Sequence, residues 1–275
     1  MRMDVQRGYH RRRRKKARVN WKWVELSFIL LFIISAALAV RTAISKLETK
    51  REEDISSQDF ISFNSESPPS SDLQDYNIPD QSITQPPMFA KASSLLEVNS
   101  DLVGMVGFGD VSLYVCQYSD NVYYASHRFD GSEDPAGMIY MDYRCSPWPL
   151  GDNTILYGHN MRDGSRFGKL NRFTKESFIL ENPVIRYATL YDMQDYIPIS
   201  VFYTSTDINA TDYFEFAQPT FANEAEFTTF INEIKKRSII QLPTSAQYGD
   251  SLLTLATCSG DKVGGRLIVV GVSTK

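Results

Sequence analysis

Two residues that could do chemistry flank the last turn of the chain. Cys258 follows the alternating run Leu252–Thr257, and Arg266 precedes the apolar run Leu267–Val272. The β-branched and apolar runs predict two strands, and the Gly and Asp residues between them predict a turn. In an antiparallel pair these two ends lie side by side, and a nearby guanidinium favours the thiolate form of a cysteine. The structural alternative is a small buried cysteine beside a surface arginine.

A histidine at another strand exit could complete this chemistry. The run Thr154–Leu156 predicts a strand, Gly158 permits a turn, and His159 follows directly. A cysteine and a histidine supply a nucleophile and a general acid or base. An arginine adds a fixed positive charge for a developing oxyanion or a substrate carbonyl. His127 is the competing base, but a strand exit beside a glycine suits a pocket rim and favours His159.

The other reactive residues argue against several kinds of site. The chain has 3 Cys and 3 His, without Cys-x-x-Cys or His-Glu-x-x-His spacing, so no disulfide framework, metal site or cofactor is expected. Cys116, within a strand pattern, and Cys145, beside two prolines, are interpreted as structural. A cysteine phosphatase would use a shorter loop that opens into a helix, whereas seven residues separate Cys258 from Arg266 and a strand follows.

Short strands dominate the carboxyl-terminal two thirds of the sequence. Runs rich in β-branched and aromatic residues, separated by Gly, Asp and Asn, predict strands over 102–108, 113–117, 122–126, 138–142, 154–157, 184–190 and 197–204, before the closing pair. Apolar residues at helical spacing predict helices over 89–98 and 223–237. Many short strands with close turns predict a mainly β domain, built as a barrel or a sandwich.

The amino-terminal region has the pattern of a membrane anchor. Residues 1–22 carry ten Lys or Arg and one Asp, although the whole chain has a net charge of −4. The apolar run 23–41 is long enough to cross a bilayer as a helix. The basic flank predicts a cytoplasmic amino end and argues against a nucleic-acid partner. A cleaved secretory signal is the alternative, because Ala37–Ala39 fits a cleavage site, and both would export the rest of the chain.

A spacer is predicted between the anchor and the folded domain. Within residues 42–88, the stretch 43–59 is rich in Lys and Glu and could be helical, whereas 62–87 is rich in Ser, Pro, Asp and Gln. This composition predicts an extracellular stalk, followed by a catalytic domain over 89–275.

Several separated motifs resemble the sortase family, and its class B branch in particular. The carboxyl-terminal motif Thr254–Cys258 with Arg266 is similar to the sortase signature. The motifs that resemble class B lie, in the family's order, at 120–124, 136–137, 141–144, 157–161 and 163–167. The resemblance covers about residues 90–275.

The resemblance implies a fold and a reaction. Sortases are membrane-anchored cysteine transpeptidases on the outer face of Gram-positive bacteria. They fold as an eight-stranded β-barrel with an N-terminal helix, and class B members add a helix between the last strands. Cys258 would attack the Thr carbonyl of a C-terminal sorting motif, LPxTG-like or NPxTx-like, and form a thioacyl intermediate. His159 would protonate the leaving amine, and Arg266 would hold the substrate and stabilise the oxyanion.

The resemblance also implies partners and groove residues. The substrates would be secreted proteins that carry the motif, and the acceptor an amine of a lipid II-type cell-wall precursor or of a pilin. Asn121, Tyr157 and Thr257 match groove positions, although turn or barrel packing is an equal alternative. Ala256 stands where several class B enzymes carry Ser, and Ala125 where relatives often carry a larger apolar residue, so both bear on the choice of motif.

Two further functions stay open at this stage. A pilin-polymerising sortase would use the same residues with a different amine. A non-catalytic surface-binding module could retain the barrel, but the intact Cys258, His159 and Arg266 argue against it.

Overall fold

The computed structural model describes residues 21–65, 88–258 and 264–274. The chain divides into two compact units, residues 1–46 and 47–275. The first unit is described through 21–46, which are helical and expose nearly all of their side chains. This stretch contains one candidate membrane span by length and composition. The predicted basic tail lies outside the described residues.

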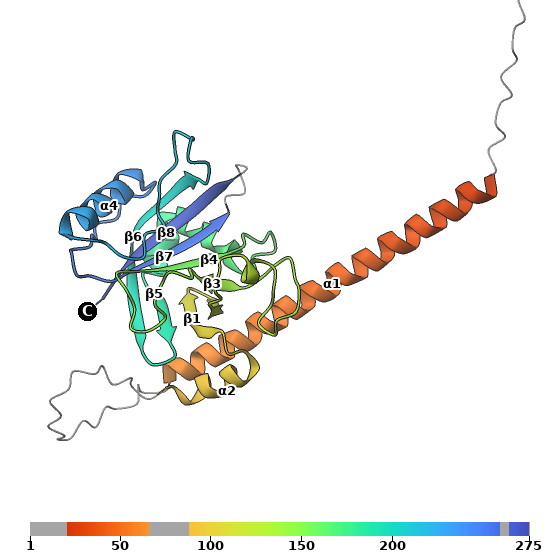
Figure 1. The fold of residues 1–275 in the computed structure, drawn as a ribbon, viewed down its shortest axis with the longest axis horizontal. Coiled ribbons are helices and arrows are strands. Elements are labelled where there is room, and N and C mark those ends of the chain that lie inside the picture. Colours follow the sequence, from red (N-terminus) through yellow and green to blue (C-terminus); the bar gives the residue numbers. More distant parts are fainter. Residues whose placement is uncertain (1–20, 66–87, 259–263, 275) are drawn as a thin grey trace, which may run out of the picture. The chain divides into compact units, whose positions relative to one another are not determined.

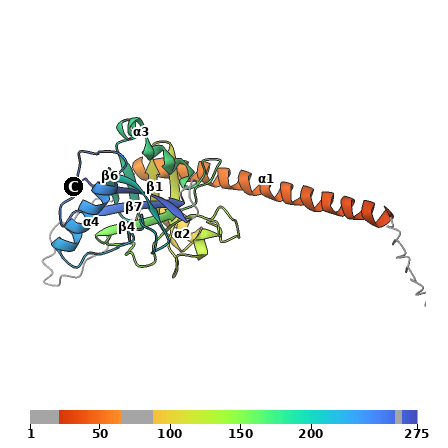
Figure 2. The same cartoon turned by 90° about the horizontal axis from the view of Figure 1, so that it is seen from above.

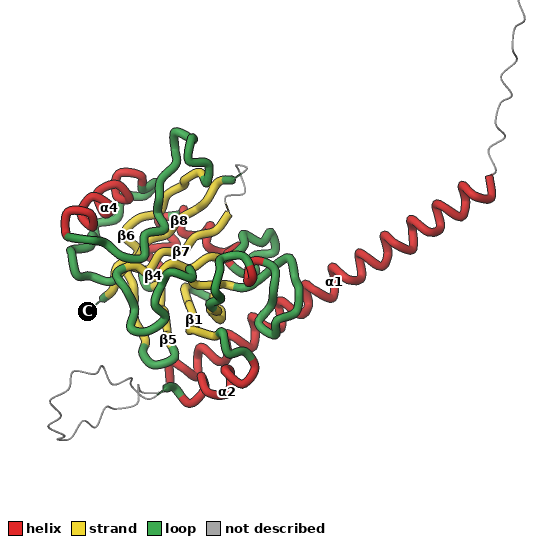
Figure 3. The backbone as a smooth tube through the Cα atoms, viewed as in Figure 1, coloured by secondary structure: helices red, strands yellow, loops and turns green. Residues whose placement is uncertain are grey.

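The second unit is built around a β-barrel (Figures 1 and 3). The barrel is closed, and its neighbouring strands follow the order β1-β2-β3-β4-β7-β8-β6-β5. The strands are β1 (Leu102–Phe108), β2 (Val111–Cys116), β3 (Ile139–Met141), β4 (Asn153–Gly158), β5 (Ile185–Thr189), β6 (Met193–Ser205), β7 (Leu252–Cys258) and β8 (Gly265–Ser273). The pairs β2–β3 and β4–β7 are parallel, and the other neighbours are antiparallel. The predicted eight-stranded barrel is confirmed.

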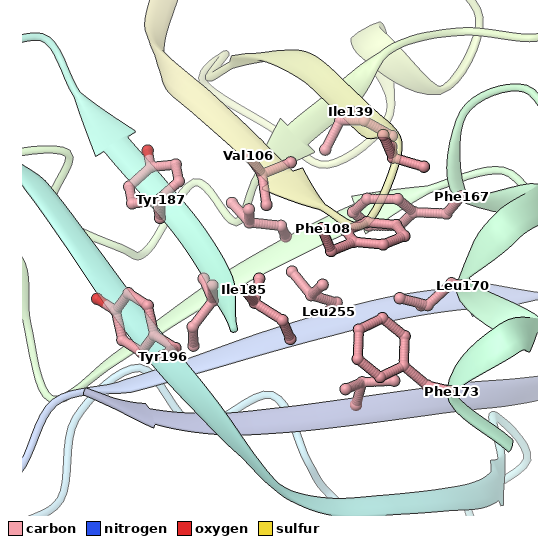
Figure 4. Packing of buried hydrophobic residues seen from close by; sticks show 14 of the residues in the cluster. Val106, Phe108, Ile139, Phe167, Leu170, Phe173, Ile185, Tyr187, Tyr196 and Leu255 are labelled. Carbon is pink, nitrogen blue, oxygen red and sulfur yellow. The ribbon is translucent and has the colours of Figure 1, made fainter. Parts of the chain in front are cut away.

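Apolar side chains from most strands fill the barrel (Figure 4). Val106, Ile139 and Leu255 are fully buried, together with Phe167 and Leu170 of the 3₁₀ segment η2 (Phe167–Thr174). Burying a side chain of this size contributes about 1.5–3 kcal/mol relative to exposure in water. The strand ends that carry the candidate site are therefore fixed by a dense core.

Two helices that the sequence predicts, α2 (Ala90–Val98) and α4 (Glu224–Arg237), accompany the barrel. Helix α4 joins β6 to β7 and lies against β6 on the outside of the barrel (Figure 2). Asn223 caps it by accepting a hydrogen bond from the Glu226 backbone N–H at 3.0 Å. Its buried Phe and Ile side chains pack on the strands, as expected. Helix α2 precedes β1, and the short α3 (Glu176–Glu181) follows η2.

One predicted strand, 122–126, is wrong. The segment forms a 3₁₀ turn, η1 (Tyr123–Ala125). Asp120 precedes it, and one carboxylate oxygen accepts the backbone N–H groups of Val122 and Tyr123 at 2.8 Å each. This local capping satisfies two backbone donors that a strand would otherwise pair with a neighbour.

The predicted stalk differs from the structure in its first part. Helix α1 runs from Trp21 to Ser65, and its residues from Leu47 onward belong to the barrel unit. Phe60 and Phe63 are buried there, in a cluster that also contains residues of α2 and β1. Two large aromatic side chains on one helix face need a covering surface, so this stretch packs on the domain. The rest of the predicted stalk, 66–87, lies outside the described residues.

Candidate active site

The strand register places the three predicted catalytic residues at neighbouring positions of one barrel edge. Strands β4 and β7 are parallel, with Gly158 opposite Thr257. His159 follows Gly158 and Cys258 follows Thr257, so the two strands end at the same end of the barrel. Strand β8 is antiparallel to β7, with Cys258 opposite Arg266. Neighbouring strands lie about 4.8 Å apart, which brings the three backbones together.

The end of β4 is locked in place before His159. The Thr257 hydroxyl donates to the Gly158 carbonyl at 2.8 Å, across the two parallel strands. A side chain at position 158 would collide with Ile139 and Phe167 of the core, so only glycine fits. The exit of β4 is therefore held by packing as well as by the strand ladder.

A backbone carbonyl orients the imidazole of His159. The ring Nε2 lies 2.7 Å from the carbonyl oxygen of Ala125. Because a carbonyl can only accept, Nε2 carries the proton in this contact, and the neutral ring then has an unprotonated Nδ1. The ring is partly buried. The sequence suggested a role for the small side chain of Ala125 in the choice of motif. In the structure, the backbone carbonyl of Ala125 contacts His159.

The segment that carries Ala125 is shaped by a close backbone approach. Gly137 has φ +54, and a Cβ there would lie 2.5 Å from the Tyr124 carbonyl oxygen and 2.7 Å from that of Ala125. Both distances are shorter than real Cβ contacts allow. Met138 donates its backbone N–H to the Tyr124 oxygen at 2.8 Å. Gly137 thus sets where the carbonyl that faces His159 can lie.

A buried carboxylate, Asp142, joins two of the predicted groove residues. One of its oxygens accepts the Tyr157 hydroxyl at 2.8 Å and the Asn121 amide at 3.1 Å. Arg144 forms a fork on the same carboxylate, with Nε and Nη2 at 2.9 and 2.8 Å. Arg144 also donates to the Ala217 carbonyl, which ties this cluster to the segment before α4. In the sequence, Asp142 is only one residue of the 141–144 motif, and nothing in that motif indicates this role.

The charges of this cluster are settled by its hydrogen bonds. Burial alone would raise the pKa of Asp142, but hydrogen bonds from Arg144 and Tyr157 hold it below its ordinary value. Burial, with the adjacent carboxylate, raises the pKa of Tyr157. Asp142 is therefore ionised and Tyr157 neutral at physiological pH, and the Tyr157 hydroxyl is a fixed donor.

The remaining predicted groove residues differ in exposure. Ala256 pairs with Tyr157 in the β4–β7 register, but its side chain is 1% exposed and belongs to the cluster under α4. Thr257 is equally buried and uses its hydroxyl on Gly158. Arg266 is partly buried, and its Nη1 donates to the Gly265 carbonyl at 3.1 Å. Asn121 and Tyr157 keep part of their surface exposed.

The other candidate nucleophiles and the other candidate base have packing roles. Burial raises the pKa of Cys116, and raises that of Cys145 to about 11, so both thiols stay protonated. The ring of His127 stacks on Tyr123 with centroids 3.9 Å apart, and its Nδ1 lies 2.7 Å from the carbonyl of the same residue. Among the described residues, no three His, Cys, Asp or Glu side chains gather as a metal site requires.

Comparison with known proteins gives the chain its relatives. No family model matches the sequence. Sortase B of Listeria monocytogenes is 29% identical over 181 residues, which cover 64% of this chain and 71% of the relative. A crystal structure of sortase B from Bacillus anthracis is 31% identical with a TM-score of 0.60, covering 69% of this chain and 89% of that one. A Staphylococcus aureus sortase B–substrate complex has a TM-score of 0.69 at 24% identity, and the match covers 84% of this chain and 99% of that one. At this identity it supports the shared fold alone.

The closed barrel, with Cys258, His159 and Arg266 at the ends of adjacent strands, defines the class of cysteine transpeptidases that use the sortase fold. Within that class, the identity and coverage of the Bacillus anthracis relative show that the chain belongs to the sortase B family.

Proposed function

We propose that Cys258, His159 and Arg266 are the catalytic residues of this sortase, and that it joins secreted proteins to an amine on the cell surface. The observation that carries the proposal is the register of β4, β7 and β8, which makes the three positions neighbours although they are far apart in sequence. The ionised Asp142 and the orienting carbonyl of Ala125 support it from the surrounding structure.

The proposed reaction has two acyl-transfer steps. The Cys258 thiolate attacks the Thr carbonyl of the sorting motif, and the oxyanion that forms is stabilised by the Arg266 guanidinium. The peptide C–N bond then breaks, and the His159 imidazolium donates to the leaving amine the Nδ1 proton that it took from the Cys258 thiol. A second amine attacks the thioacyl carbon, His159 takes up the amine's proton, and the Cys258 thiolate leaves. No external oxidant or cofactor is needed.

Substrate contacts are proposed for the exposed side of the Asp142 cluster. Asn121 and Tyr157 are held by the same carboxylate and are partly exposed, so they are suited to contact the sorting peptide. Ala256 and Thr257 are buried, which supports a packing role and an indirect effect on the groove. Ala256 lacks the hydroxyl that a Ser would place on the strand before Cys258. The motif preference is therefore expected to differ from that of enzymes with Ser at this position.

The membrane arrangement belongs to the same proposal. The apolar part of α1 is the candidate anchor, and the basic residues before it favour a cytoplasmic amino end with the barrel outside the cell. The acceptor would be an amine of a lipid II-type wall precursor. A pilin amine is the second candidate, because the same thioacyl intermediate serves both. A non-catalytic binding module is disfavoured by the intact residues 159, 258 and 266.

A peptide library tests this function directly. The full chain in detergent is mixed with LPxTG-like and NPxTx-like peptides, with a wall-type amine or a pilin-type amine as acceptor. We expect a thioacyl adduct on Cys258 by mass spectrometry and transfer to one of the amines. Cys258→Ala and His159→Ala should abolish transfer, whereas His127→Ala should retain it. Transfer by Cys258→Ala, or the absence of any adduct on the wild-type chain, would overturn the proposal.

A further inference from the structure

A buried arginine with unusual backbone geometry lies shortly after His159. Arg166 has φ 52, a left-handed value that is uncommon for residues other than glycine, and its side chain is among the largest that are fully buried. Such a conformation persists only where the surrounding structure enforces it. The contacts that enforce this conformation therefore indicate the role of the segment around Arg166.

Two glutamates of α1 hold Arg166. Its backbone N–H donates to Glu53 Oε1 at 2.7 Å, and its guanidinium nitrogens Nη1 and Nη2 face the two Glu52 carboxylate oxygens at 3.2 and 3.3 Å. A guanidinium facing both oxygens of one carboxylate has a defined orientation. The segment after β4 is thus clasped by the part of α1 that belongs to the barrel unit.

The same helix holds a second segment through Arg128. This side chain is 6% exposed; its Nη1 donates to Glu48 at 2.5 Å, and its Nε lies 3.6 Å from Glu52. Nη1 is also 3.3 Å from the buried Asp134 carboxylate of the same loop. Glu52 is therefore shared between Arg128 and Arg166, and it joins two loops that the strand ladder leaves unpaired.

Both loops make a hydrogen bond with His159. The Phe167 backbone N–H, next to Arg166, donates to the His159 carbonyl at 3.0 Å. On the other side, the loop of Arg128 begins at Ala125, whose carbonyl faces the His159 ring at 2.7 Å. One loop therefore fixes the backbone of the histidine, and the other fixes its imidazole.

We propose that Glu52 is a positioning residue that acts through Arg166 and Arg128 to keep the His159 imidazole in its working orientation. The Glu52 carboxylate contacts both guanidinium groups, and a neutral side chain cannot pair with either of them. Arg128 keeps Glu48 and Asp134 when that charge is removed, so the larger effect is expected through the guanidinium of Arg166. The inference rests on the proposed function, in which His159 moves the proton.

The same helix offers a matched control. Asp59 is also buried, and its carboxylate accepts the Tyr114 hydroxyl at 2.5 Å and pairs with Lys91 at 2.9 Å. These partners lie on β2 and α2 and not on the two loops around His159. Asp59→Asn should therefore weaken the docking of α1 without the specific effect on the histidine.

The experiment compares Glu52→Gln, Glu52→Asp and Asp59→Asn in the full chain, at a temperature below the melting point of each variant. In Glu52→Gln we expect the single-turnover rate of thioacyl formation to fall about 10- to 100-fold, because small misplacements of a catalytic group have effects of this size. KM for the peptide should change less than about two-fold, since the groove contacts of Asn121 and Tyr157 are intact. Glu52→Asp should recover part of the rate, and Asp59→Asn should stay within about two-fold of the wild type.

A second readout separates positioning from stability. The ¹⁵N signal of the His159 Nε2–H reports its hydrogen bond to Ala125, and it should shift in Glu52→Gln but not in Asp59→Asn. Equal rates in the two variants, or an unchanged His159 signal, would overturn the inference. If Glu52→Gln does not fold, Glu52→Asp decides by the same two measurements. His159→Ala is assayed in parallel: if it stays active, the proposed role of His159 is wrong, whereas its inactivity leaves that role standing whatever Glu52 does.

Discussion

The substitution Asp142→Asn tests how much the barrel depends on the carboxylate beneath the groove. Oδ1 of Asp142 accepts the backbone N–H and Nε–H of Arg144, and Oδ2 accepts donors from Arg144, Asn121 and Tyr157. An amide keeps only one oxygen, so at least two donors lose their acceptor in either orientation. The Asp142 side chain itself is fully buried, so the loss is expected to be about 3 kcal/mol.

A thermal unfolding measurement at pH 7 would detect this loss. For a domain of this size, about 3 kcal/mol corresponds to a fall in Tm of roughly 6–12 °C. Asp110→Asn is the matched control, because Asp110 pairs with two cations, Lys169 and Arg172, but its side chain is 62% exposed. Exposed ion pairs contribute about 0–1 kcal/mol, so this variant should stay within a few degrees of the wild type.

A particular outcome would refute the reasoning. If Asp142→Asn and Asp110→Asn lowered Tm by the same small amount, burial and hydrogen bonding would not make the Asp142 carboxylate important for stability. The role assigned to it in holding Asn121 and Tyr157 would then fail as well.

Three further predictions concern the same edge of the barrel. Gly137→Ala should lower kcat about 10-fold or more, because its methyl group would displace the carbonyl that faces His159, the proposed proton carrier. Gly131→Ala is the control, since Gly131 also has a positive φ but its nearest atom would be 3.7 Å away, and its kcat should stay near the wild-type value. Equal kcat values would refute the steric argument. The folded state lowers the pKa of Asp142 below 3.8, so its contribution to stability is complete above that pH and lost as the pH falls through the folded pKa. Acid titrations of Tm should therefore show a steeper loss below about pH 4 in the wild type than in Asp142→Asn, and parallel curves would contradict this. Iodoacetamide at pH 7.5 should label Cys258 and spare Cys145, whose pKa of about 11 keeps it protonated; prior labelling of Cys145 in the folded protein, read by peptide mass, would count against the assignment.

Local sequence patterns predicted most of the strands and the closing hairpin. Alternation in β7 and β8, with glycines between them, was enough to expect Cys258 beside Arg266, because a hairpin forms between segments that are adjacent in the chain. Helix α4 was also predictable from its apolar spacing and its charged ends. The segment 122–126 was misjudged because its apolar content suggested a strand, while a single Asp120 side chain favoured a turn.

The parallel pairing of β4 with β7 was not visible in the sequence. It joins segments almost one hundred residues apart, and the sequence of neither strand indicates which other strand it pairs with. This pairing brings His159 to the edge that holds Cys258. The contact of its ring with Ala125 is equally non-local, because it uses a backbone carbonyl that every residue type possesses.

The sequence by itself determined which residue types could do the chemistry, where most strands lie, and that an apolar run precedes the domain. The tertiary structure alone decided that residues 47–65, which look like part of a stalk, belong to the barrel unit. Glutamates on a helix are solvated in most proteins, so Glu52 gave no signal until Arg128 and Arg166 were found buried against it. Burial turns these ordinary charges into a specific contact, because a buried charge requires a partner and a surface charge does not.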